Sequence, residues 1–338
     1  MTDMMKAVLL HEFGGPENLQ YSESQIPVVG SNEVLVKVHA VGLNPPDWYL
    51  RAGYQALPPE WWPDPAFPLI LGTDVSGVVA AVGEDVSEFT IDDEVYSMVR
   101  FPQRIMEGSG AYADYVSVPC SELAMKPQRV RHVEAAGAPM SLLTAWQFLV
   151  ELGHDALNPF QSFRHMPVTL EGRTVLVNGA GGGVGHFAVQ IAKWKGARVI
   201  AVASSRNEEL MRELGADEFI DYTKVSAEKA VKNIDLVLDT VGGSNMERFL
   251  MCIKQGGALF LVNPLGFAGQ DEAARKNITV SATQVRSNGA QLTAAGSLLD
   301  KGTIRVVIDS IYPLSMASAA HQRAALGSLQ GKIVLTNF

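Results

Sequence analysis

Cysteine is nearly absent from this chain. Its 338 residues include only Cys120 and Cys252, which lie far apart in the sequence. Two distant thiols cannot form a framework of disulfides, and they cannot supply a four-cysteine zinc site. Scarce cysteine is typical of a reducing compartment, and the first residues lack the basic and then apolar pattern of a secretory signal. We therefore expect a cytoplasmic protein.

Positive charge and long apolar runs are also limited. There are 27 lysines and arginines against 36 aspartates and glutamates, which gives a net charge of -9. A nucleic-acid-binding protein needs a basic face, so we expect no nucleic-acid partner. No apolar run reaches the roughly 20 residues that span a bilayer, so we expect no membrane partner. The length and the apolar fraction of 47% suffice for two domains with their own cores.

Three common catalytic motifs are missing. His186 and Phe187 follow Gly185, where a P-loop needs Lys and then Ser or Thr. No tyrosine is followed four residues later by lysine, so the Tyr/Lys pair of short-chain dehydrogenases is absent. A Gly-x-Ser-x-Gly nucleophile elbow is absent too. Phosphate-loop, short-chain dehydrogenase and serine hydrolase chemistry are thereby excluded.

A glycine-rich turn is the most informative segment that is present. Residues 174–177 form an apolar, β-branched run that predicts a buried strand, and an apolar face with helical spacing follows the glycines. Ala180, Gly182 and Gly185 have the spacing of a dinucleotide fingerprint, with Ala in the first glycine slot. Small residues let the backbone approach a pyrophosphate, and the N-terminus of the following helix offers free N–H groups.

The residues after the next predicted strand indicate which dinucleotide is bound. Residues 198–203 form that strand, about 20 residues beyond the turn, where NAD-binding sites usually carry Asp or Glu. This chain has Ser204, Ser205 and Arg206 there. Two hydroxyls and a guanidinium can bind a 2′-phosphate that a carboxylate would repel, so we predict NADPH. The alternative is that Arg206 only begins the next helix.

The pattern of elements predicts two domains. Residues 1–129 carry short strand runs separated by Gly, Pro, Ser and Asn, which favours a partly closed barrel or sandwich. Strands then alternate with helices, which predicts a doubly wound parallel sheet. The less regular expectations are a helix over 133–152 with a possible bend at Pro139, a helix over 243–254, a strand over 303–308, a helix over 315–326 and a strand over 332–335.

Motifs along nearly the whole chain resemble the medium-chain dehydrogenase/reductases, in particular the zeta-crystallin type of quinone oxidoreductase. Besides the glycine turn they are Leu10-His-Glu-Phe-Gly-Gly-Pro-Glu, Gly42-Leu-Asn-Pro-Pro-Asp, Gly72-Thr-Asp-Val-Ser-Gly, Gly110-Ala-Tyr-Ala-Asp-Tyr, Thr144-Ala-Trp, Leu214-Gly-Ala-Asp, Asp239-Thr-Val-Gly-Gly and Gly331-Lys-Ile-Val-Leu. The resemblance implies an α/β protein with a GroES-like, β-rich catalytic domain (1–129 and 286–338) and an inserted Rossmann cofactor domain (130–285). Nicotinamide and substrate would lie in the cleft between the domains.

The resemblance also bears on zinc, because the superfamily includes zinc alcohol dehydrogenases. This chain has Asn44 and Thr73 where those enzymes place a Cys and a His ligand, and residues 135–141 offer neither type for the third ligand. Neutral Asn and Thr are poor replacements in a tetrahedral site. We expect no bound metal, and hence no plain alcohol oxidation, which depends on a metal to acidify the hydroxyl.

Without zinc, hydride transfer to an electron-poor carbon remains possible. A quinone or an α,β-unsaturated carbonyl compound accepts hydride if the protein supplies donors near its oxygen and a proton. The resemblance implies that Asn44, Asp47, Tyr49 and Arg51 lie beside nicotinamide and substrate. We expect Tyr49 to be the donor or proton source, with Tyr54 as its rival; the alternative is that water supplies the proton. A proline-rich segment with Trp61 and Trp62 either walls the substrate pocket or covers the barrel or a subunit contact.

The resemblance further implies a set of cofactor contacts along the cleft. They are Thr144, Val262 and Asn263 near the nicotinamide side, Ala180, Gly182, Gly183 and Val184 at the pyrophosphate, Ser204, Ser205 and Arg206 at the 2′-phosphate, Tyr222 near the adenosine, and Lys332.

Three functions stay open at this point. The first is an NADPH-dependent quinone or enone reductase, the second an enoyl-thioester reductase, and the third a non-catalytic NADPH-binding protein. By analogy with such enzymes we expect a homodimer that pairs the edge of the nucleotide sheet, around residues 277–284, across a two-fold axis.

Overall fold

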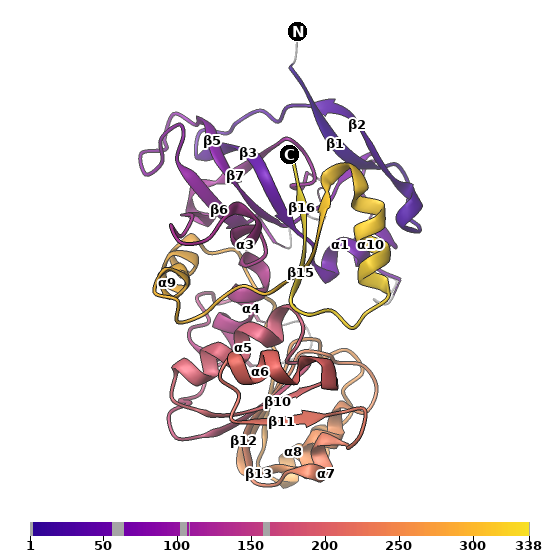
Figure 1. Ribbon diagram of the computed structural model, residues 1–338, viewed down its shortest axis with the longest axis vertical. Helices are drawn as coiled ribbons and strands as arrows, with labels where there is room; N and C mark the ends of the chain where they lie inside the picture. Colours follow the sequence, from indigo (N-terminus) through magenta and orange to yellow (C-terminus); the bar gives the residue numbers. More distant parts are fainter. Residues whose placement is uncertain (1–2, 56–63, 102–106, 108, 158–162, 338) are drawn as a thin grey trace.

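The two largest sheets divide the chain into two parts, stacked along the long axis of the molecule (Figure 1). The structure is a computed structural model that describes residues 3–55, 64–101, 107, 109–157 and 163–337. None of its described helices is both long and apolar enough to cross a bilayer. Trp61 and Trp62 lie outside the described residues.

The lower part contains a six-stranded parallel sheet. Its strand order is β11 (Glu218–Asp221), β10 (Arg198–Ala203), β9 (Thr174–Asn178), β12 (Ile234–Asp239), β13 (Ile253–Leu261) and β14 (Thr279–Ser281). The chain moves outward from β9 in one direction and then returns to its other side, so the order reverses between β9 and β12. In open parallel sheets ligands bind at such a reversal, beyond the carboxyl ends of the strands. The predicted doubly wound sheet is confirmed, and the glycine turn leaves β9 at this point.

The upper part joins the two ends of the chain in one sheet. Its seven strands run in the order β15 (Ile308–Pro313), β16 (Lys332–Thr336), β3 (Glu33–Gly42), β5 (Asp74–Val82), β6 (Glu94–Met98) and β8 (Leu123–Met125), with β7 (Tyr115–Pro119) also paired to β3. A smaller antiparallel sheet contains β2 (Leu19–Gln25), β1 (Met4–Leu10) and β4 (Leu69–Ile70). Because Val334 pairs with Gly42, the C-terminal strand lies directly beside the loop that follows β3.

Helices connect and cover the sheets. The α-helices are α1 (Pro45–Arg51), α3 (His132–Ala136), α4 (Pro139–Leu149), α5 (Gly183–Trp194), α6 (Glu208–Glu213), α7 (Ala227–Ala230), α8 (Gln270–Arg275), α9 (Gly289–Asp300) and α10 (Ala317–Ala325). The 3-10 turns are η1 (Pro16–Asn18), η3 (Cys120–Glu122), η4 (Ser205–Asn207), η5 (Met246–Met251) and η6 (Leu314–Met316).

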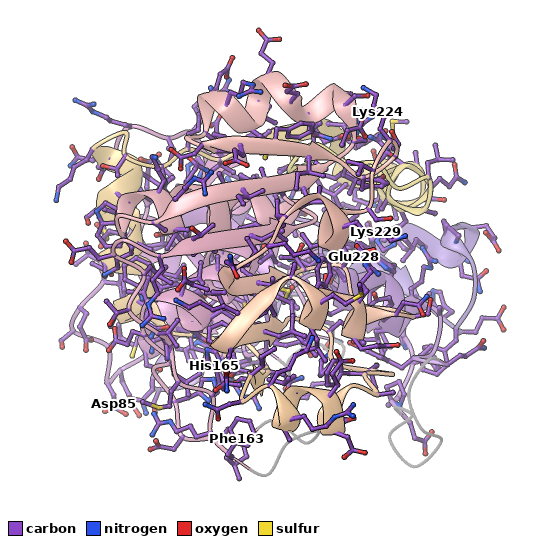
Figure 2. The ribbon with its side chains drawn as sticks, turned by 90° about the horizontal axis from the view of Figure 1, so that it is seen from below. Asp85, Phe163, His165, Lys224, Glu228 and Lys229 are labelled. Carbon is purple, nitrogen blue, oxygen red and sulfur yellow. The ribbon has the colours of Figure 1, made fainter. Side chains whose placement is uncertain are left out.

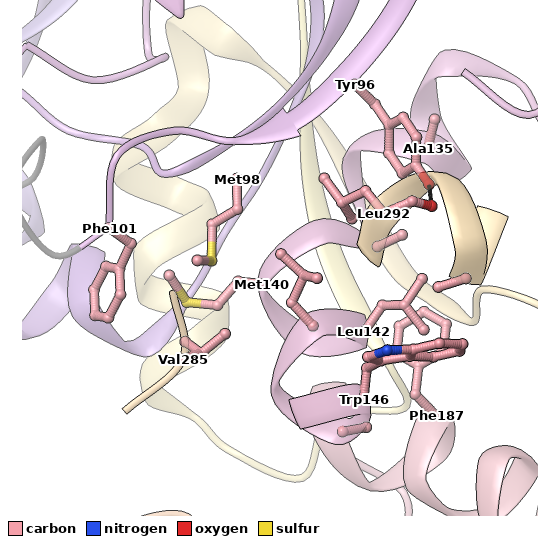
Figure 3. Close-up of a cluster of buried hydrophobic side chains, with 14 of the residues drawn as sticks. Tyr96, Met98, Phe101, Ala135, Met140, Leu142, Trp146, Phe187, Val285 and Leu292 are labelled. Atoms are coloured by element: carbon pink, nitrogen blue, oxygen red, sulfur yellow. Dashed lines mark hydrogen bonds between the residues drawn. The ribbon is translucent and has the colours of Figure 1, made fainter. Parts of the chain in front are cut away.

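A continuous apolar core holds the two parts together. All eleven residues of α4 are buried, and this helix lies between the two sheets (Figure 1). Figure 3 shows Met140, Leu142 and Trp146 of α4 beside Phe187 of α5, with Met98 and Tyr96 above them. The Tyr96 hydroxyl donates a 2.6 Å hydrogen bond to the Leu292 carbonyl on α9. Dense packing of this kind fixes the walls of any cavity between the parts.

Three expectations about elements were wrong. The helix over 133–152 is two helices, because the chain breaks at Gly137 and Ala138 before Pro139 begins α4. The segment 243–254 forms only η5, because Asn245 adopts a left-handed conformation and Ile253 already begins β13.

The strand expected over 303–308 begins only at Ile308. The chain crosses from one part to the other here, and side chains of α5 take up its backbone groups. Gln190 accepts from the Arg305 N–H at 2.8 Å and donates to the Arg305 carbonyl at 3.0 Å. The backbone of this segment is therefore hydrogen-bonded by polar side chains and not by a neighbouring strand.

Candidate active site

One cavity of about 640 Å³ lies between the two parts of the molecule. The upper part contributes the loop and helix after β3 and the start of β16, including Leu43, Trp48 and Lys332. The lower part contributes the glycine turn and the carboxyl ends of β9, β10 and β12. A cavity at the strand-order reversal of a doubly wound sheet is the position expected for a dinucleotide.

The glycine turn forms the centre of the cavity wall. Gly182 is the N-cap residue of α5 and has extended backbone angles. A Cβ on Gly185 would lie 2.1 Å from the Gly179 carbonyl oxygen, so the turn closes only with glycine there. A Cβ on Gly182 would meet nothing nearer than 3.4 Å, because this residue borders the cavity. The free N–H groups at the start of the twelve-residue α5 therefore face a space that suits a pyrophosphate.

A buried histidine supports the turn from behind. His186 Nδ1 lies 3.0 Å from the Gly182 carbonyl oxygen, and the Val307 N–H donates to Nε2 at 3.3 Å. Burial lowers the pKa of His186 to about 4, so the ring is neutral at pH 7 with its proton on Nδ1. This ring ties the turn to the segment that returns to the upper part.

The cavity continues past the end of β10. Ser204 lines it, and Asn207 Nδ2 donates to the Ser204 hydroxyl at 3.1 Å. Asn207 Oδ1 is buried and has no hydrogen-bond partner within the described chain. Ser205 and Arg206 are exposed and lie outside the lining, and the Arg206 carbonyl accepts from Gln330 Nε2 at 3.1 Å. The structure thus brings Ser204 to the cavity and adds Asn207, which no sequence motif indicated.

Lys332 is held in the opposite wall by a buried polar cluster. Its side chain is 3% exposed, and its ammonium donates to the Leu43 carbonyl at 2.9 Å and to Asn44 Oδ1. Asp74 Oδ2 lies 3.7 Å from Nζ and has no hydrogen bond from any described residue. Burial lowers the pKa of Lys332 and raises that of Asp74 to about 6. The cluster is a desolvated ion pair that borders the cavity through Lys332.

Asn44 and Asp47 lie behind the cavity wall. Asp47 accepts from the Asn44 N–H at 2.7 Å and from the Gly72 N–H at 3.1 Å, which caps α1. Burial raises the pKa of Asp47 to about 7. Asn44 Nδ2 donates to the Thr73 hydroxyl at 3.2 Å, so the residues at the two zinc-ligand positions bond each other. In the described ranges no three His, Cys, Asp or Glu side chains gather where they could hold a metal ion.

The aromatic residues of α1 form one group with Tyr54, which follows the helix. Trp48 lines the cavity, and its ring centroid lies 5.9 Å from that of Tyr49, which lies 6.1 Å from that of Tyr54. Burial raises the pKa of both phenols, so both are neutral at pH 7. Arg51 turns away from this group, with Nη1 2.9 Å from His321 Nδ1 and Nε donating to the Gly14 carbonyl. Tyr49 is 43% exposed, whereas Tyr54 is half-buried.

Some of the other residues predicted to contact the cofactor line the cavity, and the rest lie outside its lining. Val184 and Tyr222 line the cavity, whereas Ala180 is buried behind the turn. The Thr144 hydroxyl is buried and donates to the Met140 carbonyl at 2.6 Å. Val262 and Asn263 follow β13, half-buried and outside the lining.

Several lining residues carried no recognisable signal in the sequence. Besides Asn207 they include Ser141 on α4, Glu228 on α7 and Arg248 on η5. Trp48 also lines the cavity, and its position there could have been inferred from the sequence, because it directly precedes Tyr49. The others are brought in by packing between elements distant in the sequence.

Two family models match the chain. Residues 30–128 match the alcohol dehydrogenase GroES-like domain, and residues 214–335 match the zinc-binding dehydrogenase model. The first corresponds to the sheet built around β3. The second includes β12, β13 and the C-terminal strands.

Individual proteins are similar over almost the whole chain. The mitochondrial NAD(P)H oxidoreductase RTN4IP1 of Danio rerio is 33% identical, with 98% of this chain and 91% of that protein covered. The chloroplastic NADPH-dependent alkenal/one oxidoreductase of Arabidopsis thaliana is 31% identical, over 98% of this chain and 79% of that one. The solved structure of the quinone oxidoreductase from Coxiella burnetii superposes with a TM-score of 0.85 at 30% identity, covering 99% and 100% of the two chains.

Proposed function

Because this chain belongs to the medium-chain dehydrogenase/reductase superfamily and is a quinone oxidoreductase-like oxidoreductase, we propose that it is an NADPH-dependent reductase of quinones or α,β-unsaturated carbonyl compounds. The observation that carries the proposal is the cavity between the two parts, which joins the N-terminus of α5 to the aromatic group of α1. The cofactor, when bound, supplies a hydride. The protein's part is to bind the phosphates, exclude water and provide a proton to the substrate.

A zinc-independent reaction fits the residues at the two ligand positions. Asn44 and Thr73 already bond each other, and the Lys332 ammonium also contacts Asn44. A divalent cation placed there would be repelled by the ammonium and would find neutral oxygens as ligands. Reduction of a conjugated acceptor needs only hydrogen-bond donors near its oxygen, so it suits this wall.

The preference for NADPH over NADH is assigned to Ser204 and Arg206. Ser204 borders the cavity at the end of β10, and Arg206 is two residues further on. Replacing Arg206 with Ala should raise the KM for NADPH at least ~10-fold, the scale of one charge-assisted contact of about 1.5–3 kcal/mol, and should leave the KM for NADH unchanged. Steady-state kinetics with both cofactors checks this. Arg212→Ala, on the exposed face of α6, is the matched control. An unchanged NADPH/NADH preference in Arg206→Ala would contradict the assignment.

The proton donor is assigned to Tyr49, with Tyr54 as the second candidate. Both phenols are neutral and lie near cavity-lining Trp48. Replacing the donor by Phe should lower kcat about 100-fold with little change in KM, because general acid catalysis contributes on the order of 10²–10⁴. Tyr21→Phe, on the exposed strand β2, is the control. If Tyr49→Phe and Tyr54→Phe both keep near-normal kcat, water is the proton source instead.

The overall proposal is tested by NADPH oxidation with 1,4-benzoquinone and with an alkenal. We expect turnover with both acceptors and none with a primary alcohol and NADP⁺. Turnover only with an enoyl thioester would identify an enoyl-thioester reductase. Binding of NADPH without turnover on any acceptor would point to a non-catalytic protein.

Assembly and location are further parts of this proposal. Among the described residues β14 is an edge strand of the parallel sheet, and we expect it to pair with β14 of a second copy to form a homodimer. The cytoplasm stays our expectation for the location, although the similar protein of Danio rerio is named as mitochondrial.

A further inference from the structure

The cavity extends beyond Ser204 into a compartment that no motif in the sequence identifies. Its walls are Tyr222, Ala227 and Glu228 on one side and Arg248 and Phe249 on the other. These residues come from the end of β11, from α7 and from η5. Figure 2 views the molecule from below and shows Glu228 beside Lys229, right of the centre of that view.

Glu228 is a buried carboxylate with unused hydrogen-bonding capacity. Its side chain is only 9% exposed and borders the cavity. Arg248 Nε lies 3.7 Å from Oε2, beyond hydrogen-bond length, and no described residue donates a hydrogen bond to the Glu228 carboxylate. Arg248 is therefore an ion-pair partner of Glu228 that donates no hydrogen bond to it; its Nη1 donates to the Asn245 carbonyl at 3.1 Å and its guanidinium stacks 4.6 Å from the Phe249 ring centroid. A buried acceptor in this position is favourable only if a donor reaches it from the cavity.

We propose that the Glu228 carboxylate accepts a hydrogen bond from the exocyclic amino group of the cofactor's adenine, and so selects an adenine dinucleotide. This inference rests on the proposed function, because it assumes that a dinucleotide fills the cavity. With the pyrophosphate at the glycine turn and the ribose at Ser204, the next group along the cofactor is the base. Tyr222 also lines this compartment and is 57% exposed, so its ring provides a surface on which a flat base can pack.

The charge of this compartment argues for the base rather than the phosphate. Arg248 balances the charge of Glu228, so this compartment offers a 2′-phosphate no net positive charge, and the carboxylate itself would repel the phosphate. The amino group of adenine is instead a donor, which is what an ionised carboxylate needs as an acceptor-only group. Hypoxanthine carries a carbonyl oxygen at the same position, so Glu228 should reject it.

The test compares NADPH with its hypoxanthine analogue, which has a carbonyl oxygen in place of the amino group and a proton on the neighbouring ring nitrogen. Dissociation constants are measured by titration calorimetry on the full chain, without any turnover. Wild type should bind NADPH about 10-fold or more tightly than the analogue, since one buried hydrogen bond to a charged group is exchanged for a repulsion. In Glu228→Gln the ratio should fall to about 2 or less, because the amide can accept from adenine and donate to hypoxanthine.

Two comparisons make the result specific. Glu208→Gln changes the same charge on the exposed face of α6 and should retain the wild-type ratio. NADH should lose affinity in Glu228→Gln by the same factor as NADPH, because the adenine is common to both. A wild-type protein that binds the two bases equally, or a Glu228→Gln protein that keeps the wild-type ratio, would overturn the inference. The inference would also be overturned if Glu228→Gln changed only the ratio of the affinities for NADPH and NADH.

The inference and the proposed function can fail separately. If wild type reduces benzoquinone with NADPH but does not discriminate between the bases, only the role of Glu228 is wrong. If wild type binds neither dinucleotide, both are wrong. The melting temperature of each variant verifies that it is folded.

Discussion

Gly182→Val should lower the affinity for NADPH by about 100-fold or more, about 2.7 kcal/mol, while the protein stays folded. The backbone angles of Gly182 are φ −85° and ψ −176°, which valine adopts readily. A Cβ at this position meets no protein atom closer than 3.4 Å, so the new side chain extends into the cavity. There it occupies the space in which a pyrophosphate would contact the N–H groups of α5.

Titration of the nicotinamide fluorescence gives the affinity, and thermal unfolding gives the melting temperature. Gly182→Ala should lie between wild type and Gly182→Val. Gly185→Val is the contrasting variant and should fail to fold, because its Cβ would lie 2.1 Å from the Gly179 carbonyl oxygen. A folded Gly182→Val protein that binds NADPH as wild type does would show that the cofactor does not approach this turn.

Lys332→Met should lower the free energy of unfolding by about 3 kcal/mol or more. The substitution leaves Asp74, which is fully buried, without the only cation near its carboxylate in the described chain. It also removes the donor that reaches both the Leu43 carbonyl and the Asn44 side chain. Removing one partner of a buried ion pair lowers the free energy of unfolding by more than the intact pair adds to it, because the other charge is left buried and unpaired.

Urea unfolding of a small set of variants isolates this effect. Asp74→Asn combined with Lys332→Met should recover part of the loss, because residue 74 then carries no unpaired charge. Lys193→Met breaks the exposed pair with Asp217, and we expect a change below about 1 kcal/mol. If Lys332→Met and Lys193→Met are equally stable, the buried cluster around Lys332 does not stabilise the fold.

The sequence predicted the cofactor sheet well because its signals are local. The apolar run of β9, the glycines after it and the alternation of strands and helices each arise within a few residues. The same reasoning failed at residues 303–307, where Gln190 and His186 satisfy the backbone from another domain. It also missed the break in the helix before Pro139, where the sequence indicated only a bend.

The site was predictable to the extent that a motif fixes a position relative to the turn. Ser204 and Val184 follow from the fingerprint, and both line the cavity. Motif matching could not indicate that the Asn44 side chain donates a hydrogen bond to Thr73, or that the Asp47 carboxylate caps α1. It also gave no signal for Glu228, which reaches the cavity only because α7 packs beside η5.

Transfer of deuterium from NADPH that carries deuterium at both hydrogens of nicotinamide C4 to an α,β-unsaturated ketone is the decisive measurement for hydride transfer in this cavity. We expect one deuterium on the β-carbon of the saturated product, a solvent-exchangeable proton on the α-carbon and one equivalent of NADP⁺. Mass spectrometry and proton NMR of the product locate the label. Deuterium on the carbonyl carbon, or a product without deuterium, would contradict hydride transfer to a conjugated acceptor in this cavity.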